Sequence, residues 1–251
     1  MTVATRTGTR IDEIADRIYR ICTPVPPEAM PGGFTFNQYL LDDDRPLLFH
    51  TGMRALFPAV REAIESVIPA DRLRYVAFGH VEADECGALN RFLAAAPRAE
   101  PVCGRVGAQI SLGDLADRPA RALEDGEALS LGAKSVVWID APHVPHNWEN
   151  GFLYERSTGT LLCGDLFTRA GHDLPPLTAG DILGPAEAMR LAEPDSGLPL
   201  SYSRAPDTRA TLERLAALKP TTLAVMHGSA WQGSGRESAR MLRALGEGLA
   251  G

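Results

Sequence analysis

Four segments with β-strand character each run directly into histidine or acidic residues. The segments are Leu73–Phe78, Ser135–Ile139, Thr160–Cys163 and Thr222–Met226. The polar residues that follow them are, in the same order, His80 with Glu82 and Asp84, then His146, Asp165 and His227. Because ligands of α/β proteins usually bind at the carboxyl ends of strands, we expect these six side chains to gather at one edge of the fold.

The first group has a regular spacing. His80, Glu82 and Asp84 alternate, so an extended backbone would point all three to the same side. Taken singly, each residue has an ordinary structural explanation: a loop histidine for His80, a helix N-cap for Asp84, a turn residue for Asp165. The repeated placement after strands instead favours a metal site.

The donor types restrict the metal. Three carboxylates with three imidazoles form a harder ligand set than an imidazole-dominated hydrolytic zinc site. Their three negative charges nearly balance two ferrous ions, and anionic oxygen ligands favour the ferric state. Iron therefore fits best, although zinc or manganese also binds carboxylate–imidazole sites.

With these residues in view, the sequence resembles the metallo-β-lactamase superfamily. Glu82 stands where most of that family has histidine, as in its flavodiiron and oxygen-binding diiron members. The gaps also resemble theirs, with 61 residues between Asp84 and His146, 18 between His146 and Asp165, and 61 between Asp165 and His227. The resemblance extends from about Ile18 to Leu249. It implies an α/β fold, a four-layer αββα sandwich.

The resemblance also implies the ligand roles. One iron would bind His80, Glu82 and His146, a second would bind Asp84 and His227, and Asp165 would bridge them. We expect two iron ions, with zinc or manganese as alternatives. No phosphate-binding glycine loop is evident, so no bound flavin is expected.

Glu85 departs from the family pattern, which has histidine directly after the aspartate. Three explanations are open. Glu85 could ligate the second metal; it could support the site from behind, or leave a water or an open position on the second metal; or it could complement the dipole of the following helix.

Composition narrows the class of protein. The chain has 251 residues with 25 Lys+Arg against 32 Asp+Glu, a net charge of −7, which disfavours nucleic-acid and anionic-lipid binding. It shows neither a secretory signal nor a run of apolar residues long enough to span a membrane. Four dispersed cysteines favour reduced thiols in the cytoplasm.

We expect a single domain over residues 1–251. A flavodoxin domain would need about 100–150 further residues, so any flavin would come from a separate protein.

These observations predict a non-haem diiron protein that binds or reduces dioxygen or nitric oxide, with electrons from a separate redox partner. A homodimer is expected from the resemblance. Two alternatives remain: a dinuclear zinc hydrolase, in which the metals supply a hydroxide nucleophile, and a stoichiometric oxygen-sensing module.

Other elements and residues receive simpler predictions. Helices are expected over Met53–Ile68, Glu85–Ala95, Thr208–Leu218 and Glu237–Leu249, and loops over Pro24–Gly33 and Leu174–Pro185. Loop or structural roles are expected for His50, His143 and His172, inert packing for Cys86 and Cys163, and core packing rather than the pocket wall for Trp148, Tyr202 and Trp231.

Overall fold

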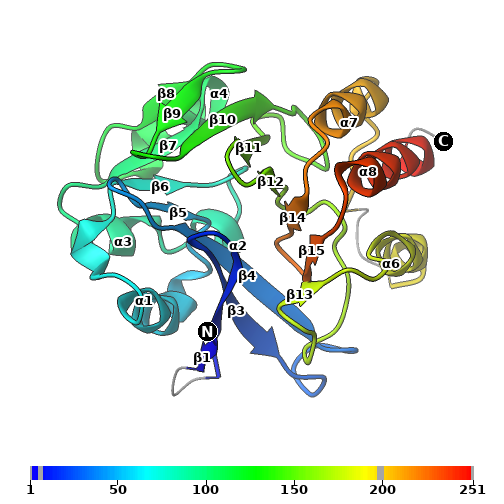
Figure 1. The fold of residues 1–251 in the computed structure, drawn as a ribbon, viewed down its shortest axis with the longest axis horizontal. Coiled ribbons are helices and arrows are strands. Elements are labelled where there is room, and N and C mark those ends of the chain that lie inside the picture. Colours follow the sequence, from blue (N-terminus) through cyan, green and yellow to red (C-terminus); the bar gives the residue numbers. More distant parts are fainter. Residues whose placement is uncertain (1, 5–7, 197–200, 250–251) are drawn as a thin grey trace.

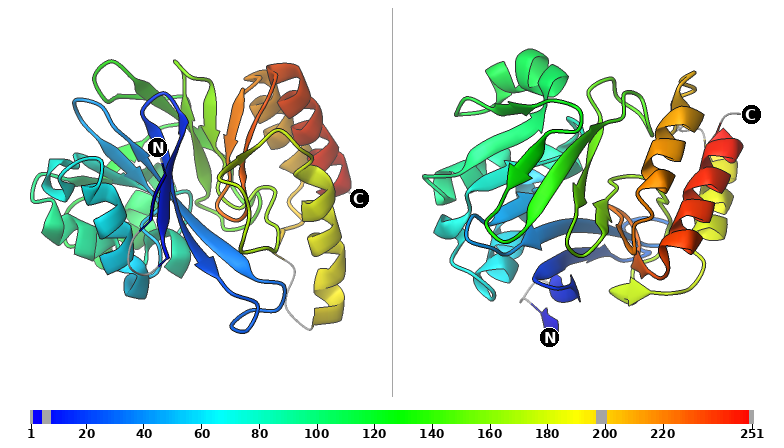
Figure 2. Two further views of the ribbon diagram at one scale, coloured as in Figure 1. Left: turned by 60° about the horizontal axis from the view of Figure 1, so that its bottom comes forward. Right: turned by 45° about the horizontal axis from the view of Figure 1, so that its top comes forward.

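Two mixed β-sheets face each other, and helices cover the outer face of each (Figure 1). The structure is a computed structural model that describes residues 2–4, 8–196 and 201–249. The layers follow the order helix, sheet, sheet, helix, which is also visible from the two other directions of Figure 2. The predicted αββα sandwich is therefore confirmed.

The first sheet is built in chain order. Its strands are β1 (Thr2–Ala4), β2 (Arg10–Ala15), β3 (Ile18–Val25), β4 (Phe34–Leu41), β5 (Leu47–Phe49), β6 (Tyr75–Ala77), β7 (Glu100–Gly104) and β8 (Arg121–Leu123). Pairing is antiparallel from β1 to β5 and parallel from β5 to β8. The parallel half carries its strand ends to one edge, where β6 leads into His80.

The second sheet has the order β13-β15-β14-β12-β11-β10-β9. These strands are β9 (Ala128–Ser130), β10 (Ser135–Asp140), β11 (Gly151–Glu155), β12 (Thr160–Leu162), β13 (Leu177–Thr178), β14 (Thr222–Ala224) and β15 (Ala230–Gln232). Strands β12 and β14 are parallel neighbours. Their carboxyl ends therefore lie side by side, which brings Asp165 and His227 to the same edge.

Three apolar clusters define the layers. One lies between the sheets and includes Tyr39, Phe49, Trp138 and Leu153. A second joins the first sheet to α1 (Phe57–Glu65) and α3 (Leu89–Ala95). A third joins the second sheet to α6 (Leu183–Ser196), α7 (Thr208–Ala217) and α8 (Gly235–Leu249). Among the described residues, none of the helices combines the length and apolar composition that a bilayer crossing requires.

The helix predicted over Glu85–Ala95 is wrong in detail. The structure has two helices, α2 (Ala83–Cys86) and α3, separated near Gly87. The extended backbone expected across His80, Glu82 and Asp84 is not found: residues 79–81 form bends, and Asp84 lies in the first turn of α2. Short helical pieces α4 (Arg105–Gly107) and α5 (Gly113–Leu115) flank a π-helical turn, and α6 begins inside the loop expected at Leu174–Pro185.

The indole of Trp138 lies between the two sheets and packs against Gly104 of β7 and Gly151 of β11. Its side chain is fully buried, and its Nε1 donates a hydrogen bond to Asp140 Oδ1 at 2.6 Å. A Cβ atom at Gly151 would lie 2.1 Å from Trp138 Cζ2, and one at Gly104 would lie 2.8 Å from the same atom. Glycine at both positions therefore makes room for the ring.

We expect Gly151→Ala to lower the free energy of unfolding by about 1–3 kcal/mol, because the methyl group overpacks against the indole. Urea denaturation of the variant and the parent measures the difference. Gly113→Ala is the control, since its new Cβ would meet nothing closer than 4.0 Å. Equal unfolding midpoints for Gly151→Ala and the parent would show that the indole can shift at little cost.

Candidate metal centre

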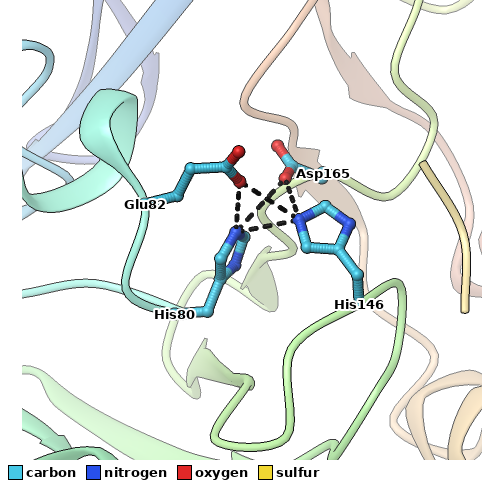
Figure 3. A group of neighbouring side chains, drawn as sticks. All are labelled: His80, Glu82, His146 and Asp165. Atoms are coloured by element: carbon cyan, nitrogen blue, oxygen red, sulfur yellow. Dashed lines mark hydrogen bonds and ion pairs between the residues drawn. The ribbon is translucent and has the colours of Figure 1, made fainter. Parts of the chain in front are cut away.

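Four of the predicted residues converge on one point at the sheet edge (Figure 3). Glu82 Oε2 lies 2.8 Å from His80 Nε2 and 3.2 Å from His146 Nε2. Asp165 Oδ2 lies 3.7 Å and 3.3 Å from the same two nitrogen atoms. One ligand atom from each residue falls within 4.8 Å of all the others. We call these four residues the first cluster.

The other oxygen of Asp165 faces a second group. Its Oδ1 lies 3.2 Å from His227 Nε2, and Asp84 Oδ2 lies 3.4 Å from that nitrogen. We call Asp84, His227 and this side of Asp165 the second cluster. The structure thus brings all six predicted residues together, with one carboxylate between two groups. Glu82 faces the first cluster and Asp84 the second, because α2 begins between them at Ala83.

All three imidazoles are held from behind by the protein. Their Nδ1 atoms lie within hydrogen-bond distance of Asn150 Oδ1 (3.0 Å from His80), Ser201 O (2.6 Å from His146) and Thr35 O (2.8 Å from His227). Protonated Nδ1 atoms would donate these bonds and leave each Nε2 lone pair directed at the carboxylates. Such outer partners fix the tautomer and orientation of metal-binding histidines.

The electrostatics of the site favour cations. Burial alone would lower the pKa of each imidazole, but the carboxylates outweigh it and raise the pKa of His80 to about 9, of His146 to about 11 and of His227 to about 10. Hydrogen bonds from His146 and His80 lower the pKa of Glu82 to about 2. Without metal ions, protons on the three imidazoles must supply the positive charge that the carboxylates of both clusters require.

The donor set fits metal ions. Asp165 is only 9% exposed, and among the described residues its Oδ1 accepts no hydrogen bond of good geometry. An oxygen that is buried without such a bond is costly unless another group, such as a cation, satisfies it. His80 Nε2 and His146 Nε2 lie only 2.9 Å apart, so the two rings present their nitrogen atoms to one position, as joint ligands of a metal ion would.

Glu85 faces away from the second cluster. It is fully buried, and its Oε2 accepts hydrogen bonds from the backbone N–H groups of Gly79 and His80, both at 2.8 Å. Its Oε1 lies 3.2 Å from His50 Nε2 and 3.3 Å from His80 Nδ1. Burial opposes its charge, yet His50 and His80 hold its pKa below the usual value. This geometry favours the second explanation, in which Glu85 supports the site from behind.

Two supporting residues were not identified from the sequence. Glu149 accepts a hydrogen bond from Val81 N at 3.0 Å, and Asn150 links His80 to Val144 O. Both are buried. Glu85 and Glu149 therefore bind backbone N–H groups of the turn after β6, whereas Asn150 holds the ring of His80. Glu149 and Asn150 follow His146 in the same loop, where nothing in the sequence distinguishes them from other loop residues.

The histidines, aromatic residues and cysteines for which simpler roles were predicted lie in different environments. His50 is buried, with Nδ1 3.0 Å from Met226 Sδ, and His143 is exposed, so their predicted structural and loop roles fit the structure. His172 packs against Gly33. Trp231 is in the core, as predicted, and Tyr202 packs against the core of the second sheet while also lining the cavity beside the clusters. Trp148 is 54% exposed, so core packing was the wrong prediction for it. All four cysteines are free, and burial raises the pKa of the Cys86 thiol to about 12 and that of Cys163 further.

The sequence model described as "ODP family beta lactamase" matches residues 34–189, more than half of the chain. The chain belongs to this family. A rubredoxin-oxygen oxidoreductase from Megalodesulfovibrio gigas is 26% identical over 210 residues, which cover 81% of this chain and 51% of that protein. A nitric oxide reductase from Moorella thermoacetica is 26% identical over 137 residues, which cover 54% of this chain and 34% of that protein.

Solved structures agree on the fold. The rubredoxin oxygen:oxidoreductase of Desulfovibrio gigas superposes with a TM-score of 0.81 at 21% identity, covering 94% of this chain and 61% of that one. The flavodiiron protein of Giardia intestinalis gives 0.75 at 16% identity, covering 96% and 59%. The resemblance to the flavodiiron type is confirmed. The chain spans about half the length, or less, of the curated relatives it matches.

We expect Glu85→Ala to lower the unfolding free energy of the metal-free protein by about 3–5 kcal/mol, since it leaves buried charges and amides without their partner. Urea denaturation after chelation measures this. Glu85→Gln, which keeps an acceptor, should lose less, and Glu65→Ala at the surface should change little. If Glu85 were instead a metal ligand only, its removal would lower metal content and leave the metal-free stability unchanged.

Metal uptake at pH 7 should release protons. The three imidazoles have pKa values of about 9, 11 and 10 in the metal-free protein, so they hold protons at pH 7, whereas a ligating imidazole must be neutral. Metal affinity should accordingly rise as the pH rises from 6 to 9. Calorimetry of zinc binding in two buffers of different ionisation enthalpy counts the protons. His143→Gln should release as many as the parent, and a heat independent of the buffer would contradict the assignment.

Proposed function

We propose that this protein is a non-haem diiron oxidoreductase that reduces dioxygen or nitric oxide. The observation that carries the proposal is the carboxylate of Asp165, whose two oxygens face two separate groups of ligands. Three carboxylates and three imidazoles suit iron better than a histidine-rich zinc site does. The names of the relatives, an oxygen oxidoreductase and a nitric oxide reductase, support the same substrates.

The proposed ligands follow the two clusters. One iron would be held by His80, Glu82 and His146, the other by Asp84 and His227, and Asp165 would contact both. When bound, two ferrous ions supply electrons to the diatomic substrate. Zinc and manganese remain possible occupants of the same ligands, and no flavin site is proposed on this chain.

The protein's own groups keep this centre in one geometry. Hydrogen bonds at Nδ1 prevent the imidazoles from rotating, and the buried Glu85 holds the backbone from which His80 projects. Tyr202 lines the cavity, and its hydroxyl donates to Asp165 O at 3.3 Å. Because these supports exist before metal binds, little reorganisation is required when the centre changes charge.

Electrons would come from a separate redox partner. The relative named rubredoxin-oxygen oxidoreductase supports a small electron-carrier protein in that role. A single domain over residues 1–251, a homodimer, a cytoplasmic location and the absence of nucleic-acid or membrane binding remain predictions from the sequence.

Metal analysis of protein produced with iron supplied tests the proposal first. We expect two irons per chain, and we expect Asp165→Ala to lose both because each cluster loses a carboxylate. Asp173→Ala, an exposed residue outside both clusters, should keep both. Two zincs with no iron, together with hydrolysis of an ester panel, would replace the proposal with a zinc hydrolase. Full occupancy in Asp165→Ala would contradict the bridging role.

The reaction is tested by stopped-flow mixing. Chemically reduced protein should be reoxidised by dioxygen or nitric oxide and should consume further substrate when reductant is present. A stable adduct that forms once and does not turn over would instead identify an oxygen-sensing module.

A further inference from the structure

The cavity above the two clusters is much larger than a diatomic gas requires. Its volume is about 600 Å³, and Glu82, Asp84, His146, Asp165 and His227 form part of its lining. A water molecule, similar in size to dioxygen, takes about 30 Å³ of liquid volume. Cavities of about 300–1,000 Å³ are typical of sites for organic ligands.

The walls of the cavity are mostly apolar. They include Phe34, Pro145, Pro185 and Met189. Phe34 is 7% exposed, and its ring packs on the imidazole of His227 with centroids 4.3 Å apart. Such a surface attracts the apolar body of an organic molecule rather than a highly charged ion.

Among the described residues that line this cavity, Arg169 is the one arginine or lysine. Arg169 follows Asp165 by four residues, and its aliphatic stem lies over Gly228, where an added Cβ would be 2.8 Å from Arg169 Cγ. Its Nε donates a hydrogen bond to Ala170 O at 3.3 Å. No carboxylate of the described residues forms an ion pair with Arg169. Its other N–H groups are therefore available for an anion, which guanidinium binds with two parallel hydrogen bonds.

Arg169 lies beside the second cluster, for which the protein provides fewer ligands than for the first cluster. The second cluster has only Asp84, His227 and one oxygen of Asp165, because Glu85 turns toward Gly79 and His80. The other acid in the cavity wall, Glu193, accepts hydrogen bonds from Ser201 N and Oγ. With metals bound, the three carboxylates of the clusters are neutralised, and the cavity can accept one negative charge at Arg169.

We propose that this cavity binds an organic anion, with its carboxylate or phosphate on Arg169 and its apolar body against Phe34 and Met189. The ligand would share the cavity with the diatomic substrate of the proposed function. The proposal rests on that function only for the metal ions that balance the charge.

Calorimetry with a matched pair of probes tests this proposal. The probes are 1-naphthaleneacetate and 1-naphthaleneacetamide, which share one ring system and differ in charge. Metal-loaded protein should bind the carboxylate about tenfold or more tightly than the amide, as a hydrogen bond to a charged group implies. Arg169→Gln should abolish this preference. Arg98→Gln, an exposed residue outside the cavity wall, should retain it.

Absence of binding, or an equal preference in Arg169→Gln, would overturn the proposal. The metal content of each sample is measured in parallel, and the titration is repeated with zinc-loaded protein. Iron-loaded protein that shows the preference but neither binds nor consumes oxygen would count against the diiron function and support the anion site. Iron-loaded, oxygen-consuming protein without the preference would do the reverse.

Discussion

The carboxylate of Asp165 lies between candidate ligands that come from both sheets. The first sheet delivers His80, Glu82 and Asp84 through the turn after β6, and the second sheet delivers His146, Asp165 and His227 from β10, β12 and β14. Neither sheet alone provides a complete set of ligands for either cluster. Cations held between them would cross-link the sheets, so binding energy at this edge is also energy for packing the sandwich. The protein therefore places three carboxylates close together at the one edge where bound metal ions would offset their mutual repulsion.

The sequence predicted the layered fold and the six side chains that gather at its edge, but not all of the individual strands and helices. The six candidate ligands were found because each follows a readable apolar strand, and a strand end constrains where the next residues lie. Strands β7, β8 and β9 were missed: β7 carries Pro101, which argues locally against a strand, and β8 and β9 lie in segments without a continuous apolar run. Helix α6 contains Pro185 and Pro194, which argue locally against a helix, yet packing on the second sheet stabilises it.

The supporting residues could not be predicted for a different physical reason. Glu85 follows Asp84 directly, and its sequence position is compatible with a ligand, a helix-end charge or a buried anchor. The choice is made by tertiary contacts: His50 reaches it from the end of β5, and the amides of Gly79 and His80 fold back onto it. Asn150 likewise gains its role only because the loop before β11 approaches His80. The contacts of Glu85 with His50 and of Asn150 with His80 join residues far apart in the chain, so they leave no local pattern in the sequence.

The orientation of Glu85 also shapes the chemistry that the site can perform. A residue that ligated the second cluster would close that side with protein atoms. Because Glu85 instead stabilises the backbone behind His80, the second cluster opens toward a wide apolar cavity whose wall carries Arg169. The ligand set determines which metals and which electron changes are feasible, whereas the cavity determines what else can approach them. Because Arg169 and the apolar wall are distinct from the six candidate ligands, changes in the wall can alter what approaches the metals without altering the ligand set.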